Sequence, residues 1–231
     1  KSKEGKIFQN SQSWAVLGKV APKDRLLRCM DAVEEHLKLD IGYRVCFPPF
    51  TDYDARVGHS STMPPGNIEN GGCYNHAAGF KLIADCMLKR PEVAWETFRK
   101  IAPGNPQNPP ARSGAEPFAF VNMYRAHEYV YGESLYAWNT GTAAWMVMGL
   151  IEWILGARRS HAGLLIDPCL SKNITHAKLF RTFRGASYSI VIDNSAGRCC
   201  GVTKINFNQK PIEGNLLPTL KSGHHEVEVI I

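Results

Sequence analysis

The stretch Glu69-Asn-Gly-Gly-Cys-Tyr-Asn-His76 joins a proline-rich loop to a segment with helical periodicity. The preceding Met63-Pro-Pro-Gly66 is incompatible with regular helix, whereas apolar residues recur at helical spacing over 77–88. The stretch itself combines a carboxylate, amides, glycines, a phenol and an imidazole. Backbone N–H groups at a helix start attract anions, and glycines let a ligand approach the backbone. We therefore expect either a sugar or anion site here, or simply a helix start preceded by a turn.

The first two-thirds of the chain is predicted to be helical. Leucines and other apolar residues recur at helical spacing over 23–39, and Asp24 lies in the first turn of that segment. Two long loops that contain several prolines interrupt the helical pattern, at 44–66 and 102–110. The alternation of helices and polar loops indicates a barrel of helical hairpins. From the residues alone, the apolar helix faces are compatible either with a self-contained bundle or with an open half-barrel that another part covers. The further helices that we expect are 12–20, 75–89, 92–101, 117–124 (short) and 140–155.

The pattern changes near Gly156, where segments rich in β-branched or alternating residues begin. We predict the first part, 1–158, to be mainly α-helical and the second part, 159–231, to be a small antiparallel β domain. Turns are expected at 208–211 and 221–224. The expected strands are 163–168, 178–183, 186–192, 201–207 and 226–231.

Composition excludes several classes of protein. The net charge is +6, but the basic residues are scattered, so we expect no nucleic-acid partner. No run of about 18 apolar residues occurs, so no membrane span is expected. The seven cysteines include no C-x-x-C pair, which favours reduced thiols in a cytoplasmic protein over a disulfide scaffold or a zinc site. The charged start, 1–6, has no apolar segment behind it and does not resemble a signal peptide.

A second group of polar residues, Asn139-Thr140-Gly141-Thr142, precedes the helix predicted near Ala143. Hydroxyls and glycine at a helix start are ordinary capping chemistry, but the same groups can also cradle phosphate. If this helix start converged with the one at His76, the two would form an anion pocket. The sequence leaves that convergence open. It contains no P-loop, no G-x-S-x-G and no H-E-x-x-H motif, and its histidines show no metal-ligand spacing.

The order of these motifs along the chain resembles that of the inverting β-glycoside phosphorylases of glycoside hydrolase family 94. Each matching segment is weak alone, but many occur in the same order. The segments are Gly5-Lys-Ile-Phe-Gln-Asn-Ser-Gln-Ser-Trp-Ala-Val16, Met30-Asp-Ala-Val-Glu-Glu-His-Leu37, Phe47-Pro-Pro-Phe50, Pro65-Gly66, Glu69-Asn-Gly-Gly72, Asn75-His76, Ala115-Glu-Pro-Phe118, Thr140-Gly-Thr-Ala-Ala-Trp145, Ile154-Leu-Gly156, Gly163-Leu-Leu-Ile-Asp-Pro-Cys169 and Phe183-Arg-Gly-Ala186.

The resemblance implies a fold and a reaction. The fold would be the second half of an (α/α)6 barrel followed by a jelly-roll-like β-sandwich. The reaction would be the reversible, inverting phosphorolysis of a β-linked disaccharide or oligosaccharide to an α-sugar 1-phosphate. Inorganic phosphate would be a co-substrate, and no cofactor or metal is implied. Carried over by motif, the phosphate-binding residues would be His76, Thr140, Gly141 and, more loosely, Asn122. Glu69 would bind sugar hydroxyls on the acceptor side.

The chain departs from the family pattern in one important respect. The general acid of the family is an aspartate in a D-W-N-D-like segment upstream, and no such segment occurs here. We therefore expect no catalytic residue in this chain, an inactive isolated chain, and the missing N-terminal part of the enzyme as its partner. We also expect a homodimer. A non-catalytic carbohydrate- or phosphate-binding module derived from the same barrel is the alternative. A structural remnant without any ligand is a third possibility.

Overall fold

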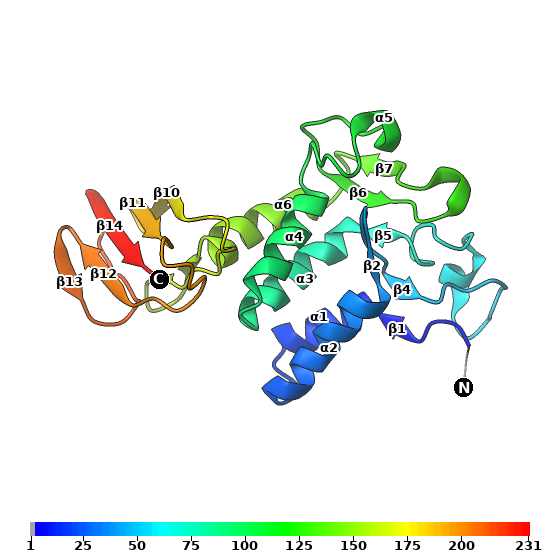
Figure 1. Ribbon diagram of the computed structural model, residues 1–231, viewed down its shortest axis with the longest axis horizontal. Coiled ribbons are helices and arrows are strands. Elements are labelled where there is room, and N and C mark those ends of the chain that lie inside the picture. Colours follow the sequence, from blue (N-terminus) through cyan, green and yellow to red (C-terminus); the bar gives the residue numbers. More distant parts are fainter. Residues whose placement is uncertain (1–2) are drawn as a thin grey trace. The chain divides into compact units, whose positions relative to one another are not determined.

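The computed structural model describes residues 3–231, so Lys1 and Ser2 of the charged start lie outside the described residues. The chain forms two compact units. The N-terminal unit runs to Leu88 and resumes over Glu96–Val147, and the C-terminal unit comprises Lys89–Trp95 and Met148–Ile231. Helices dominate the first unit and long strands the second (Figure 1), which agrees with the predicted order of α followed by β.

The helices of the first part follow the apolar periodicity closely. They are α1 (Gln9–Leu17), α2 (Lys23–His36), α3 (Asn75–Met87), α4 (Pro91–Ile101) and the short α5 (Pro110–Ser113). In α2, Leu26, Met30 and Val33 are buried, which is the spacing of one helix face. Leu26 and Met30 pack with Val16 of α1 and Ala84 of α3. This cluster holds α1, α2 and α3 together.

A buried ion network connects α2, α3 and α4. The ammonium group of Lys81 has no exposed surface and lies 2.7 Å from a carboxylate oxygen of Asp85 and 2.6 Å from one of Glu34. It also donates to Thr97 at 3.1 Å and lies 4.0 Å from the centre of the Tyr43 ring. Burial alone would lower the pKa of Lys81, but the neighbouring carboxylates outweigh it and raise that pKa. The network fixes the position of α3.

Short strands occupy the loops of the N-terminal unit. Two pairs lie near its start: β1 (Ile7–Phe8) with β4 (Cys46–Phe47), and β2 (Lys38–Leu39) with β3 (Gly42–Tyr43). A three-stranded antiparallel sheet consists of β5 (Cys73–Tyr74), β6 (Val121–Tyr124) and β7 (Ser134–Ala137). Single turns of 3-10 helix, η1 (Gly58–Thr62) and η2 (Glu128–Val130), lie in the connecting loops.

The helix predicted over 117–124 is wrong, because Val121–Tyr124 is the central strand of this sheet. Val121 and Met123 are buried and Asn122 between them is half-exposed, and Tyr124 at the end of the strand is buried as well. The alternation over the first three residues is the period of a strand, and four residues are too short a sample to distinguish it from a helix. The error matters because the strand presents Asn122 on the opposite face from the core.

The helix predicted over 140–155 begins as α6 (Thr142–Met148) and continues as η3 (Gly149–Ile154), which is π-helical. The C-terminal unit then contains the hairpin of β8 (Ala157–Arg159) and β9 (Leu164–Ile166) and a five-stranded sheet (Figure 1). The strands of that sheet, in spatial order, are β10 (His176–Phe183), β11 (Ala186–Asp193), β14 (His224–Ile230), β12 (Lys204–Phe207) and β13 (Lys210–Ile212).

The prediction of a purely antiparallel β domain is wrong in one strand pair. The last strand, β14, lies between β11 and β12 and pairs antiparallel with β12 but parallel with β11. Its insertion between two earlier strands buries Val227 and Val229 beside Ile190 and Ile192. Local alternation of residues specifies each strand, but it does not specify which neighbour a returning strand will have.

Candidate functional site

His76 is the second residue of α3, directly after strand β5. Its imidazole is half-buried and lies against two aromatic rings, with ring centres 5.1 Å from Phe80 and 6.4 Å from Trp145. Burial lowers the pKa of His76 below its ordinary value of 6.5, because the protonated ring loses hydration. The neutral imidazole is therefore favoured at neutral pH, with one nitrogen able to donate and the other able to accept a hydrogen bond.

Thr140 lies just before α6 and is held by three polar contacts. Its hydroxyl donates to the side-chain oxygen of Asn122 at 2.8 Å and accepts from the backbone N–H of Thr142 at 3.0 Å. The hydroxyl oxygens of Thr140 and Thr142 are 2.7 Å apart. Since Thr140 gives its proton to Asn122, Thr142 is the donor in that last contact. Thr140 thus caps α6 and connects it to strand β6.

Gly141 connects the start of α6 to His76. A Cβ atom at this position would lie 2.9 Å from Nε2 and 3.1 Å from Cε1 of the imidazole. Only glycine lets the backbone approach the edge of the ring this closely. A similar approach occurs one turn further along α3, where a Cβ on Gly79 would lie 2.8 Å from Cβ of Trp145. The two helix starts therefore converge, which the sequence had left open.

The sheet places Asn122 in this group. Strands β5 and β6 pair Tyr74 with Met123, so the next position along β6 faces the start of α3. There the buried side chain of Asn75 donates to the carbonyl of Val121 at 3.2 Å. Asn75 is a residue that sequence reasoning did not select for the site. Its only signal was an amide at a helix start, which is equally typical of a cap.

The structure thus brings four of the five predicted site residues into one half-exposed cluster: His76, Asn122, Thr140 and Gly141. We call this the α3–α6 polar cluster. It offers a hydroxyl, an amide, an imidazole and backbone N–H groups at the starts of two helices. Such groups are suited to holding an anion, because they supply hydrogen-bond donors and no carboxylate.

Glu69 is exposed and lies in the turn that precedes strand β5. Backbone pairing of Asn67 with Asn70 forms the turn, and the carbonyl of Glu69 accepts from the thiol of Cys46 at 3.6 Å. The Asn70 side chain anchors the turn by bonding to the backbone of Phe50 on both sides, at 2.7 and 2.8 Å. Within residues 3–231, no hydrogen bond connects the Glu69 carboxylate to the α3–α6 polar cluster.

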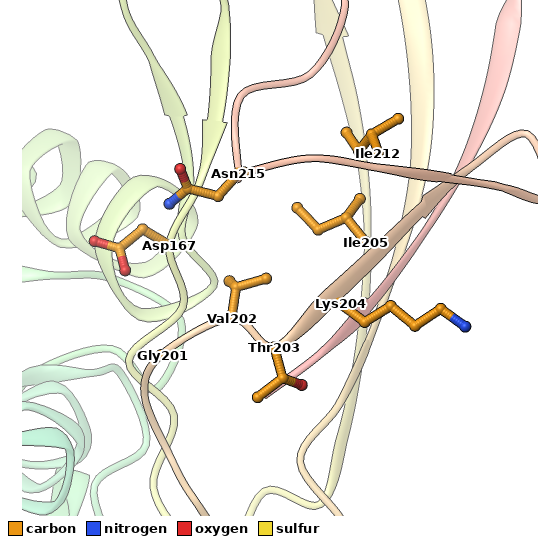
Figure 2. A pocket seen from close by; sticks show the side chains of 9 residues that line it. Asp167, Gly201, Val202, Thr203, Lys204, Ile205, Ile212 and Asn215 are labelled. Atoms are coloured by element: carbon orange, nitrogen blue, oxygen red, sulfur yellow. The ribbon is translucent and has the colours of Figure 1, made fainter.

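A cavity of about 270 Å³ in the C-terminal unit contains none of the predicted site residues (Figure 2). Asp167 and Asn215 lie on one side of it, Thr203 lies apart from them, and the Lys204 side chain points away. The Asp167 carboxylate is already paired with Lys89 at 2.6 Å and Arg158 at 3.1 Å. In the part of the chain that the structure describes, no group of histidine, cysteine and acidic residues could hold a metal ion. No helix of this same part is long and apolar enough to cross a membrane.

Residues 1–156 match the catalytic domain of the glycosyl hydrolase 94 superfamily. The chain therefore belongs to this family, as the ordered motifs predicted.

Its relatives include named glycoside phosphorylases. The chain is 36% identical to solabiose phosphorylase of Paenibacillus borealis, over 98% of this chain and 30% of the relative. It is 35% identical to 3-O-beta-D-glucopyranosyl-beta-D-glucuronide phosphorylase of the same organism, over 98% of the chain and 30% of the relative. It is 28% identical to N,N'-diacetylchitobiose phosphorylase of Vibrio proteolyticus, over 99% of the chain and 29% of the relative. The chain thus spans less than a third of the length of these relatives.

Proposed function

We propose that this chain forms part of a glycoside phosphorylase and supplies one wall of its phosphate site. The reaction would be the reversible, inverting phosphorolysis of a β-linked disaccharide or oligosaccharide to an α-sugar 1-phosphate. Membership of the glycosyl hydrolase 94 superfamily and the phosphorylase names of the relatives support it. The observation that carries it is the contact of Thr140 with Asn122 and the close approach of Gly141 to His76, which join three separate segments of the chain.

Each member of the α3–α6 polar cluster has a role in this proposal. The backbone N–H of Gly141 donates to a phosphate oxygen, and the Thr140 hydroxyl, which donates to Asn122 in this structure, turns its proton to phosphate when the anion binds. The start of α6 favours the negative charge of the phosphate. The imidazole of His76 contributes a further donor. Asn122 orients the Thr140 hydroxyl, and its NH2 group can donate to phosphate. Phosphate is itself an anionic nucleophile, so the protein needs to position it in line with the anomeric carbon and needs no second carboxylate to activate a water.

The proton for the departing sugar must come from elsewhere. In the family pattern, that general acid is an aspartate in a segment upstream of the motifs found here. Loss of a general acid typically reduces a rate by ~10²–10⁴-fold. We therefore propose that the isolated chain is inactive and that it works together with the upstream part of the enzyme. Glu69, in its exposed turn, would bind hydroxyls of the acceptor sugar.

We further propose that residues 1–158 are the second half of an (α/α)6 barrel and that 159–231 form the C-terminal β-sandwich domain. On this proposal the α3–α6 polar cluster lies on the barrel wall, and the upstream half supplies the facing wall with the acid. A homodimer and a cytoplasmic location remain parts of the same proposal.

A chimera tests the proposed reaction. The segment of the Paenibacillus borealis solabiose phosphorylase that aligns with this chain is replaced by the chain itself, which is 36% identical to it. The chimera should convert solabiose to sugar 1-phosphate only when phosphate is present, and the ¹H NMR spectrum should show the α-anomer first. A folded chimera that hydrolyses the disaccharide without phosphate, or that forms the β-anomer, would refute the proposal.

A further inference from the structure

Two large aromatic side chains stand exposed beside the α3–α6 polar cluster. Phe118 is 70% exposed and Trp138 is 67% exposed, although such rings normally contribute to a core. Their ring centres are 6.0 Å apart and their planes meet at 55°. Trp138 is two residues from Thr140, so the pair lies at the edge of the proposed phosphate site.

The backbone holds Trp138 in an unfavourable conformation. Its φ is +69°, and the N–H of Asn139 donates to the carbonyl of Ala137 at 2.8 Å, across Trp138. A hydrogen bond between residues i and i+2 closes a γ-turn. When the central residue has a positive φ, as Trp138 has, the turn is the strained form, which is rare for a bulky residue. The strain is not compensated by burial, because the ring projects into solvent. Strain of this kind is typical of positions selected for binding rather than for stability.

A carboxylate completes the arrangement. The indole Nε1–H of Trp138 donates to one oxygen of Glu116 at 3.2 Å, so the ring is fixed in orientation. Glu116 is exposed, and its second oxygen is open to a ligand. Phe118 is carried by the turn in which the N–H of Ala119 donates to the carbonyl of Glu116 at 3.1 Å. Two separate loops thus bring two rings and one hydrogen-bond acceptor to the same place.

We propose that Phe118, Trp138 and Glu116 form a saccharide-binding platform that holds a pyranose ring of gluco configuration. Such a ring presents axial C–H groups on its flat faces and hydroxyls around its edge. The C–H groups match the electron-rich face of an aromatic ring, and an edge hydroxyl can donate to the free oxygen of Glu116. This inference rests on the proposed function, since it assigns a position to the sugar next to the phosphate.

Oxidation of exposed tryptophans by N-bromosuccinimide, read residue by residue with mass spectrometry, tests this platform in the full chain. Trp14 is the internal control, because it is also exposed (48%) but packs its ring on Phe80 of α3. Cellobiose should slow the oxidation of Trp138 and leave that of Trp14 unchanged. Sorbitol, an acyclic polyol with no flat ring face, should protect neither. Equal oxidation of Trp138 with and without cellobiose would overturn the inference.

Substitutions give a second readout. Phe118→Ala removes one ring without touching the strained turn, so the fold and the Thr140 contacts are expected to persist. It should weaken cellobiose binding about tenfold, the effect of losing one aromatic anchor, whereas Tyr129→Ala, an 83% exposed control, should not. Unchanged cellobiose affinity in Phe118→Ala would contradict the platform. Phosphate binding, tested separately with Thr140→Val, is independent of this result, so either proposal can fail alone.

Discussion

The hydroxyl of Thr140 donates a 2.8 Å hydrogen bond to the side-chain oxygen of Asn122. This contact joins the start of helix α6 to strand β6, and strand β7 lies between these two elements in the sequence. In this structure the Thr140 hydroxyl proton points at the amide oxygen of Asn122. The lone pairs of Thr140 then accept from Thr142, and the cap of α6 is complete.

Replacing Thr140 tests this cap. Thr140→Val keeps the shape of the side chain but removes the hydroxyl, so the N–H of Thr142 and the oxygen of Asn122 both lose their partner. The free energy of unfolding should fall by about 1–2 kcal/mol, as for the loss of other helix caps. Thr140→Ser retains the hydroxyl, so its free energy of unfolding should decrease much less. Thermal or denaturant unfolding measures both, and equal stability of Thr140→Val and the unchanged chain would contradict the hydrogen-bonding scheme.

Gly141 is expected to be intolerant of any side chain. Gly141→Ala places a methyl group where Nε2 of His76 lies only 2.9 Å away, so the imidazole must move. The variant should lose stability and, in the chimera, raise the KM for phosphate. The double variant Gly141→Ala with His76→Ala removes the clash. The loss of unfolding free energy in the double variant should therefore be smaller than the sum of the losses in the two single variants, and strict additivity would contradict the contact.

The ionisation of His76 should report on the proposed phosphate. Burial lowers its pKa below 6.5, so the unfolded chain binds more protons than the folded one between that lowered value and 6.5. The contribution of His76 to stability therefore rises with pH through this window and is lost as pH falls through it. A nearby phosphate favours the protonated ring, so titration by NMR should give a higher pKa in the presence of phosphate. A pKa that phosphate leaves unchanged would remove His76 from the site.

The buried network under α3 should be essential for folding. Lys81→Met leaves the carboxylates of Asp85 and Glu34 without their buried cation, and removing one partner of such a pair costs about 3–5 kcal/mol. The matched control is Arg28→Met, since the pair of Arg28 with Asp24 is exposed on both sides. That variant should change stability by no more than about 1 kcal/mol. Urea unfolding measures the unfolding free energy of both variants. Similar decreases in Lys81→Met and Arg28→Met would contradict the claim that the buried ion pairs contribute more to stability than the exposed pair.

The elements that sequence predicted well are those with long, regular patterns. Helix α2 shows its apolar face over four turns, and β10 and β11 alternate over eight residues each. The strand β6 was predicted as helix because its four residues carry too little periodicity. Its partner β5 comes from a distant segment and its partner β7 follows it along the chain, and pairing with both decides its conformation. Tertiary context overrides local propensity most easily in elements this short.

The candidate site was predictable in its residues but not in its geometry. Residue types at two helix starts, together with the family resemblance, selected His76 and Thr140. Their convergence depends on two glycines, because Gly79 and Gly141 let α3 and α6 approach closely. The sequence shows that these positions are glycine, but it does not show which side chains pack against them. In the structure these are Trp145 at Gly79 and His76 at Gly141. Phe118 and Trp138 are aromatic residues near the polar segments, which could stack on sugar rings, but aromatic residues in such positions are more often core. The structure shows that these two side chains are exposed.

The KM for phosphate of the solabiose phosphorylase chimera, with and without Thr140→Val, tests the central claim most directly. If the α3–α6 polar cluster holds the attacking phosphate, the substitution should raise the KM for phosphate about tenfold or more and change the KM for the disaccharide little. Thr140→Ser should remain close to the unchanged chimera. An unaltered KM for phosphate in a folded and active Thr140→Val chimera would show that phosphate binds elsewhere.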